Sequence, residues 1–445
     1  MKLAIALLCL FTLPHLVNGQ QSQPAVDPVL KAEIDKIKAI DNHAHPLKVV
    51  RDGEPPDNDY DALPLDAIEQ TTSPIRIRPD NPEYVGAWRS LFGYPNEDMS
   101  EAHLRELVKT KQASARAHGD GYSAWVLDQL GIETMLANRV AMGRGLNDTK
   151  RFRWVSFVDA LMIPLNIEGS GGTPDQKSLF KKEIELRERY LADLKLKAIP
   201  ATLDQYLKQV VTATLERQKN AGVVAVKFEA AYLRPLDFSD ATPETAGRVY
   251  AAHAANKTMP SAADYKLLQD FLFRYISRDA GRMGLPVHIH SCDGGGGSYQ
   301  QGGSDPLLLE SVFNDPTLRK TNFVIVHGGC QLFYRHTASL LSKPNVYADF
   351  SAMTFLNPPR ELSHALRLWM ESQPEKVLFG TDAFAMSPEI GWEEVGWLST
   401  TTARQALAMA LTDMMNDGEI THERAIELAK MVLRGNALRL YGWKE

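Results

Sequence analysis

The sequence predicts an α/β protein: a distorted (β/α)8 barrel with a long, mostly helical insertion after its first strand. Eight short apolar runs occur along the chain, and most are separated by segments of helical periodicity. Buried strands that alternate with helices form parallel sheets covered on their outer face, and eight such units close a barrel. The predicted strands are residues 39–45, 134–140, 153–161, 222–230, 285–291, 322–329, 345–351 and 376–384.

Helices are predicted where apolar residues recur with helical spacing between start and stop signals. The clearest is 261–284, which has an apolar stripe and ends at a glycine, and Ser100 is a plausible N-cap for the helix 100–119. The other predicted helices are 29–37, 175–220, 306–318, 332–341, 360–372, 402–415 and 421–434.

Residues 48–119 form the predicted insertion. Apart from the helix 100–119 they are polar and irregular, with stretches rich in Pro and Asp such as RDGEPPDNDYD. Such stretches are typical of loops. Because the segment lacks its own series of strands, we expect it to pack over one end of the barrel, and 20–445 to be a single domain.

The N-terminal residues 1–19 have the pattern of a secretory signal peptide. Lys2 supplies a positive charge, residues 3–13 are mostly apolar but too few to span a bilayer, and Val17 and Gly19 suit a cleavage site. An uncleaved anchor is the alternative. No other segment has 18 uninterrupted apolar residues, so we expect an exported protein without a membrane span, periplasmic or secreted.

Composition and charge restrict the partners. With 44% hydrophobic and 23% charged residues the chain is an ordinary globular protein, and its net charge of −6 comes without a long basic run. We therefore do not expect nucleic acid as a partner. We expect a small-molecule substrate instead.

Chemistry is expected where barrel strands end. His43 and His45 close the first strand and point the same way, because alternate strand residues share a face. A lone buried histidine would be an ordinary core residue, but several that converge on one barrel mouth predict a metal site. The other polar residues near strand ends are Lys227, His288, His290, His327 and Asp382.

This ordered set resembles the amidohydrolase superfamily of metal-dependent hydrolases. The stretches DNHAHPL, VKFEAAYLRPL, LPVHIHS, VIVHGGCQLF and VLFGTDAF resemble its amidohydrolase-related branch, which also contains metal-dependent decarboxylases. The resemblance covers residues 39–441 and is poorest over the insertion.

The resemblance implies a zinc site, with another divalent metal as the alternative. His43, His45, His290 and Asp382 would be the ligands, and a bound zinc ion lowers the pKa of its water to about 7. Asp382 would also act as general base. His327 would hydrogen-bond the substrate or water in one-metal members, and would bind the second ion in two-metal members.

Lys227 distinguishes those two arrangements. In two-metal relatives such a lysine is carboxylated and bridges the ions; otherwise it would bind a substrate carboxylate or pair with Glu229. The pattern of Lys227, Tyr232 and Arg234 is more similar to the one-metal branch, so one ion is favoured over two. The expected catalytic residues are then Asp382, His327 and Lys227.

Loops at the strand ends supply further predictions. Tyr232, Arg234 and Arg335 are candidates for substrate contact, and the glycine-rich residues 292–305 for a loop over the site. If strands five and six are neighbours, Cys292 and Cys330 lie near one rim, where they either form a disulfide or are two unrelated small residues.

The function expected from these observations is that of an exported metal-dependent hydrolase. A metal-activated water would attack the carbonyl carbon of an amide, a lactone or a similar bond. One alternative hypothesis is a metal-dependent decarboxylase or other lyase on the same barrel. Another is a binding protein without catalytic activity. A homodimer is suggested by analogy alone.

Overall fold

The structure is a computed structural model, and it describes residues 26–51, 53–63, 73–167, 173–292, 294 and 299–444. The predicted signal peptide, residues 1–19, lies outside this part of the chain. Within it, no helix combines the length and the apolar character needed to cross a bilayer.

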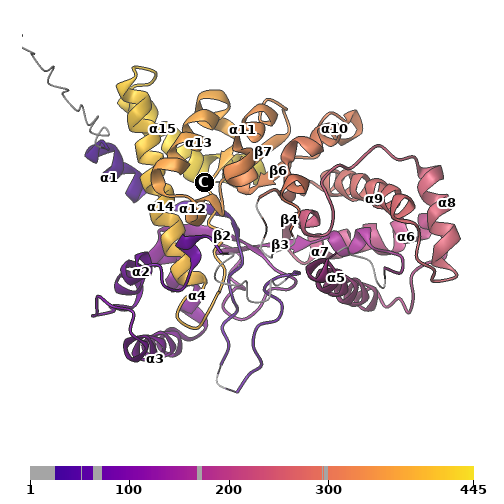
Figure 1. Cartoon of the computed structure of the whole chain (residues 1–445), viewed down its shortest axis with the longest axis horizontal. Coiled ribbons are helices and arrows are strands. Elements are labelled where there is room, and N and C mark those ends of the chain that lie inside the picture. The colour runs from indigo at the N-terminus through magenta and orange to yellow at the C-terminus, as the bar shows by residue number, and fades with distance from the viewer. Residues whose placement is uncertain are drawn as a thin grey trace, which may run out of the picture.

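Eight parallel strands form one sheet in the order of the sequence. Figure 1 labels β2, β3, β4, β6 and β7 of this sheet. Each lies within or beside a predicted run, so the predicted (β/α)8 barrel is confirmed. The strands are β1 (Ala39–Ala44), β2 (Ile132–Asn138), β3 (Phe152–Phe157), β4 (Val223–Phe228), β5 (Val287–His290), β6 (Phe323–Val326), β7 (Val346–Asp349) and β8 (Val377–Leu378).

The barrel closes between its first strand and the residues that follow its last. The Asn42 amide donates to the Phe379 carbonyl at 2.8 Å, and the His45 amide donates to the Ala383 carbonyl at 2.8 Å. Every residue of β1, β5 and β6 is buried, as expected for parallel strands that are covered on both faces. The strand ends therefore meet at one rim.

Helices surround the sheet (Figure 1). Three predicted helices were wrong in detail. The helix 175–220 is interrupted at 194–202, where Thr202 caps the helical turn that follows, and 306–318 is broken into short turns, with Pro316 at the start of the last one. Helix α14 (Trp392–Asn416) begins ten residues before the predicted 402 because Glu394 caps it through the Gly391 amide. The helices are α1 (Pro28–Lys36), α2 (Glu83–Phe92), α3 (Glu101–His118), α4 (Tyr122–Leu130), α5 (Pro174–Asp193), α6 (Leu203–Tyr206), α7 (Ala213–Asn220), α8 (Pro243–Ala254), α9 (Ala262–Arg282), α10 (Glu310–Phe313), α11 (Cys330–Leu340), α12 (Met353–Leu356), α13 (Pro359–Ser372), α14 (Trp392–Asn416), α15 (His422–Lys430) and α16 (Asn436–Tyr441).

The described part of 48–119 carries α2 and α3 and no strand. Both helices lie beside α4 and α14 at one edge of the barrel (Figure 1). The Trp88 indole donates to the Glu389 carbonyl at 3.1 Å, and the Lys111 ammonium lies 2.7 Å from the buried Glu394 carboxylate. Ser100 holds the N-cap position of α3, but its side chain makes no capping hydrogen bond.

Candidate active site

Three potential metal ligands meet where β1 and β8 end. The Nε2 atoms of His43 and His45 lie 3.3 Å apart, and Oδ1 of Asp382 lies 3.3 Å from the first and 3.5 Å from the second. Ligands 2.0–2.1 Å from one tetrahedral ion are separated by about 3.3–3.4 Å. The three atoms therefore already have the spacing that a zinc ion requires.

Burial sets the charge of these groups. It lowers the pKa of His43, His290 and His327 well below the usual value, and the nearby Lys227 ammonium acts in the same direction. The histidines are therefore neutral and able to bind a metal. Burial also raises the pKa of Asp382 to about 7, although the charges of His45 and Lys227 oppose that shift.

Asp41 links β1 to the residues that follow β8. Its Oδ1 accepts hydrogen bonds from the backbone amides of His43 at 3.1 Å and Thr381 at 2.9 Å, and the Thr381 hydroxyl donates to its Oδ2 at 2.5 Å. Asp382 itself has a φ of 54°, and its amide donates to the His43 carbonyl at 2.6 Å. Asp41 was not predicted as part of the site, although it alternates with His43 along β1.

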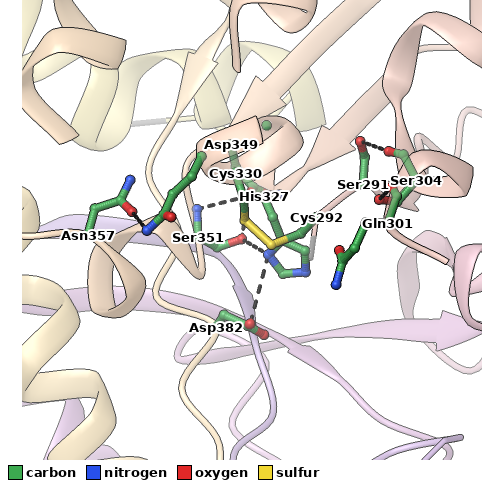
Figure 2. Close-up of a disulfide and its surroundings, with 12 residues drawn as sticks. Ser291, Cys292, Gln301, Ser304, His327, Cys330, Asp349, Ser351, Asn357 and Asp382 are labelled. Carbon is green, nitrogen blue, oxygen red and sulfur yellow. Dashed lines mark hydrogen bonds and ion pairs between the residues drawn. A yellow bond between two sulfur atoms is a disulfide. The ribbon is translucent and has the colours of Figure 1, made fainter. Parts of the chain in front are cut away.

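His327 is held by the ends of β6 and β7, as Figure 2 shows. Its Nδ1 lies 2.8 Å from the Ser351 hydroxyl and 3.8 Å from Asp382 Oδ2, and its amide donates to Asp349 Oδ1 at 3.0 Å. The Ser351 hydroxyl donates to the same oxygen of Asp349. These bonds fix the imidazole beside Asp382.

The backbone from His327 to Cys330 has positive φ at four consecutive residues. A Cβ on Gly328 would lie 2.0 Å from the Trp369 ring, so only glycine fits there. The turn ends in a disulfide between Cys292 and Cys330 that joins the loops after β5 and β6 next to His327 (Figure 2). The structure therefore supports the prediction of a disulfide over that of two unrelated small residues.

The family model described as Amidohydrolase matches residues 200–443, which is more than half of the chain. This chain belongs to the amidohydrolase family. The resemblance stated from the motifs is thereby confirmed, and the protein is an enzyme of that family. No curated protein matches the chain.

Solved structures similar to this amidohydrolase agree with its fold. They include a "putative metal-dependent hydrolase" from Lactobacillus casei, with 15% identity, a TM-score of 0.59 and coverage of 94% of this chain and 98% of that one. A uronate isomerase from Thermotoga maritima has 14% identity, a TM-score of 0.55 and coverage of 93% and 96%. A glucuronate isomerase from Caulobacter crescentus has 11% identity, a TM-score of 0.53 and coverage of 93% of each chain. At such identities these similarities show the fold alone.

His290 and Tyr232 form the other wall of the amidohydrolase site. Nε2 of His290 is buried and has no hydrogen-bond partner within the described chain. Its ring centroid lies 4.8 Å from that of His327 and 4.6 Å from that of Tyr232. The structure brings His327, rather than His290, within 4.8 Å of ligand atoms of His43 and Asp382. The fourth-ligand role of His290 stays a prediction.

The remaining histidine of β5, His288, lies deeper in the barrel. Its Nε2 is 2.8 Å from the Tyr441 hydroxyl, which donates to Asn42 Oδ1. Asn42 in turn donates to Asp349 Oδ2 at 2.8 Å, so a buried polar chain reaches the residue that supports His327.

Lys227 lies between the histidines and a group of acids. Its Nζ is 3.5 Å from His43 Nε2 and 3.6 Å from Glu229 Oε1, and the residue is 1% exposed. Asp61, from the loop before α2, places Oδ2 3.1 Å from His45 Nδ1. A carboxylate on the outer nitrogen of a metal-binding histidine fixes its tautomer. Nothing in the irregular sequence around Asp61 indicated this position.

Two predicted substrate contacts lie elsewhere. The Arg234 guanidinium is 2.6 Å from Asp270 of α9 and stacks over Phe238, so its charge is already paired. Arg335 is exposed on α11, above the Tyr334 ring. The structure brings neither to the histidines. Of the glycine-rich loop 292–305, residues 293 and 295–298 lie outside the described residues.

Proposed function

We propose that the protein is an exported hydrolase that uses one zinc ion to add water to the carbonyl carbon of an amide, a lactone or a similar bond. The observation that carries this proposal is the triangle of ligand atoms on His43, His45 and Asp382, with sides of 3.3 to 3.5 Å. Two imidazoles and a carboxylate are a donor set that suits zinc. A bound ion would lower the pKa of its water to about 7 and polarise the carbonyl.

Asp382 is suited to move the proton. One carboxylate oxygen faces His43 and His45, while the other lies 3.8 Å from His327 Nδ1 and remains available. In this mechanism Asp382 takes one proton from the attacking water and returns it to the leaving nitrogen or oxygen. His327, oriented by Ser351, hydrogen-bonds the substrate carbonyl or the developing oxyanion.

The surroundings of Lys227 support a single ion in this site. A carboxylated lysine would place a further negative charge next to Glu229, which lies 3.6 Å from Nζ, and near the buried carboxylates around it. An unmodified lysine adds no negative charge there. We infer that Lys227 is unmodified and holds the substrate or the attacking water from the β4 side.

The disulfide supports export, because such bonds persist in oxidising compartments. We propose that residues 1–19 direct the chain to the periplasm or outside the cell. Fractionation of expressing cells and N-terminal sequencing check this; a cytoplasmic chain with an intact N-terminus would contradict it.

The first experiment is elemental analysis of purified protein together with its intact mass. We expect one zinc per chain that is lost in His43→Ala, and no added mass of carbon dioxide on Lys227. Hydrolysis is then measured on a panel of N-acyl amino acids and lactones. Full activity of metal-free protein would refute the proposal, and release of carbon dioxide without consumption of water would select a lyase instead.

A further inference from the structure

Four carboxyl groups lie together on the far side of His45; three are buried, and that of Asp61 is 17% exposed. Asp61 comes from the loop before α2, Asp159 and Glu229 follow β3 and β4, and Glu183 lies on α5. Asp159 and Glu183 are 0% exposed and Glu229 is 4% exposed. We call these four residues the acidic cluster.

The acidic cluster is tightly packed around His45. The ligand atoms of His45, Asp61 and Glu229 all lie within 4.8 Å of one another. The Glu229 amide donates to Asp159 Oδ2 at 2.8 Å, and the carboxyl groups of Asp61 and Glu229 are in hydrogen-bond contact.

Several oxygens of the acidic cluster have no partner. Both oxygens of Glu183, Oδ1 of Asp159 and Oε2 of Glu229 are buried without a hydrogen-bond donor in the described part of the chain. A buried acceptor without a partner costs about 1–3 kcal/mol, and more when it is charged. The Glu183 carboxyl group also interacts electrostatically with Asp159, Glu229 and Asp61, so these oxygens belong to one buried group.

The charge of the acidic cluster points to the nature of that ligand. Lys227 offers one basic group to these four carboxyl groups, with its Nζ 3.6 Å from Glu229 Oε1. Oxygen ligands of a calcium ion lie 2.3–2.6 Å from it, so two of them are at most about 5 Å apart. The ligand atoms of His45, Asp61 and Glu229, which lie within 4.8 Å of one another, fit this limit.

We propose that Asp61, Asp159, Glu183 and Glu229 form a second cation site, which takes a hard divalent ion such as Mn²⁺, Mg²⁺ or Ca²⁺. Carboxylate oxygens suit these ions, whereas zinc prefers the imidazoles on the other side of His45. The ion acts as a positioning device: it holds Asp61 against His45 Nδ1, and Asp61 fixes the tautomer with which His45 binds the catalytic metal.

Manganese tests the site, because free Mn²⁺ gives an electron paramagnetic resonance signal that is lost on binding. Chelator-treated full-length protein is loaded with one equivalent of Zn²⁺ and titrated with Mn²⁺. We expect one further Mn²⁺ per chain in the wild type. Glu183→Gln should raise the Kd for Mn²⁺ at least about tenfold without changing the zinc content.

Glu188→Gln is the matched control, because Glu188 lies on the same helix but is exposed and paired with Arg187. It should bind Mn²⁺ like the wild type, and His43→Ala should lose zinc but keep Mn²⁺. Asp159→Asn, with circular dichroism as a fold check, replaces Glu183→Gln if that variant does not fold. Folded wild type that binds no Mn²⁺ would mean that the acids share protons, and the proposal fails. It also fails if Glu183→Gln and Asp159→Asn bind Mn²⁺ as the wild type does.

Discussion

The two nitrogens of His45 face contrasting surroundings. On the Nε2 side lie the neutral His43 and one carboxylate, that of Asp382; on the Nδ1 side lies the acidic cluster, which begins with Asp61. Nitrogen-rich sites favour zinc, and oxygen-rich sites favour hard cations. One imidazole thus separates two centres of different chemistry, and variants on either side should have separable effects.

The largest effect is expected on the Nε2 side. Asp382→Asn removes the proton acceptor and should lower kcat/KM by about 10²–10⁴-fold, while Mn²⁺ binding by the acidic cluster stays unchanged. Steady-state kinetics and the Mn²⁺ titration measure the two outcomes. A variant with more than a tenth of wild-type activity would remove Asp382 from its role as base.

The disulfide lies on the Nε2 side only, beside His327. The double variant Cys292→Ser, Cys330→Ser should lower the free energy of unfolding by about 2–4 kcal/mol, because the cross-link no longer restricts the unfolded chain. Urea denaturation measures this loss, and Mn²⁺ binding should not change. Equal midpoints and slopes for the variant and the wild type would contradict the prediction.

Asp61 links the two metal sites, because it belongs to the acidic cluster and also contacts His45 Nδ1. Asp61→Asn keeps the shape but loses the charge on His45, so zinc affinity or activity should fall about 10–100-fold and Mn²⁺ affinity should fall with it. Asp59→Asn is the control, since Asp59 in the same loop pairs with Arg189 away from the site. If only one of the two metals responds to Asp61→Asn, the link through His45 is wrong.

The pH dependence of metal binding should differ between the Nε2 side of His45 and the acidic cluster, because the two metals displace different numbers of protons. Burial raises the pKa of Asp382 to about 7, so below pH 7 zinc must displace one proton and its Kd should rise at most about tenfold per pH unit. Burial and neighbouring carboxylates raise the pKa of both Glu183 and Glu229, so the Kd for Mn²⁺ should rise more steeply. Competition with a chromophoric chelator between pH 6 and pH 8 gives the slope of log Kd against pH for each metal. Equal slopes for zinc and Mn²⁺ would contradict this prediction.

The sequence predicted those features that depend on local periodicity. All eight strands were found because buried parallel strands are continuous apolar runs, and alternation placed His43 and His45 on one face. The same alternation includes Asp41 and could have identified it. Asp61 and the pairing of Arg234 with Asp270 had no such signal, because they depend on which distant segments meet in space. The early start of α14 depends on a side-chain cap, and the pairing of Cys292 with Cys330 depends on the adjacency of β5 and β6.

The Tyr441 hydroxyl, which bonds both His288 and Asn42, affects how the chain can fold as it is made. Tyr441 and Asn42 are 399 positions apart. At about 5–20 residues per second, the ribosome needs roughly 20–80 s to reach Tyr441 after it has made β1. Until then the polar chain from His288 through Asn42 to Asp349 lacks the hydroxyl that links it. The buried polar chain that supports His327 is therefore completed only after α16 has been synthesised.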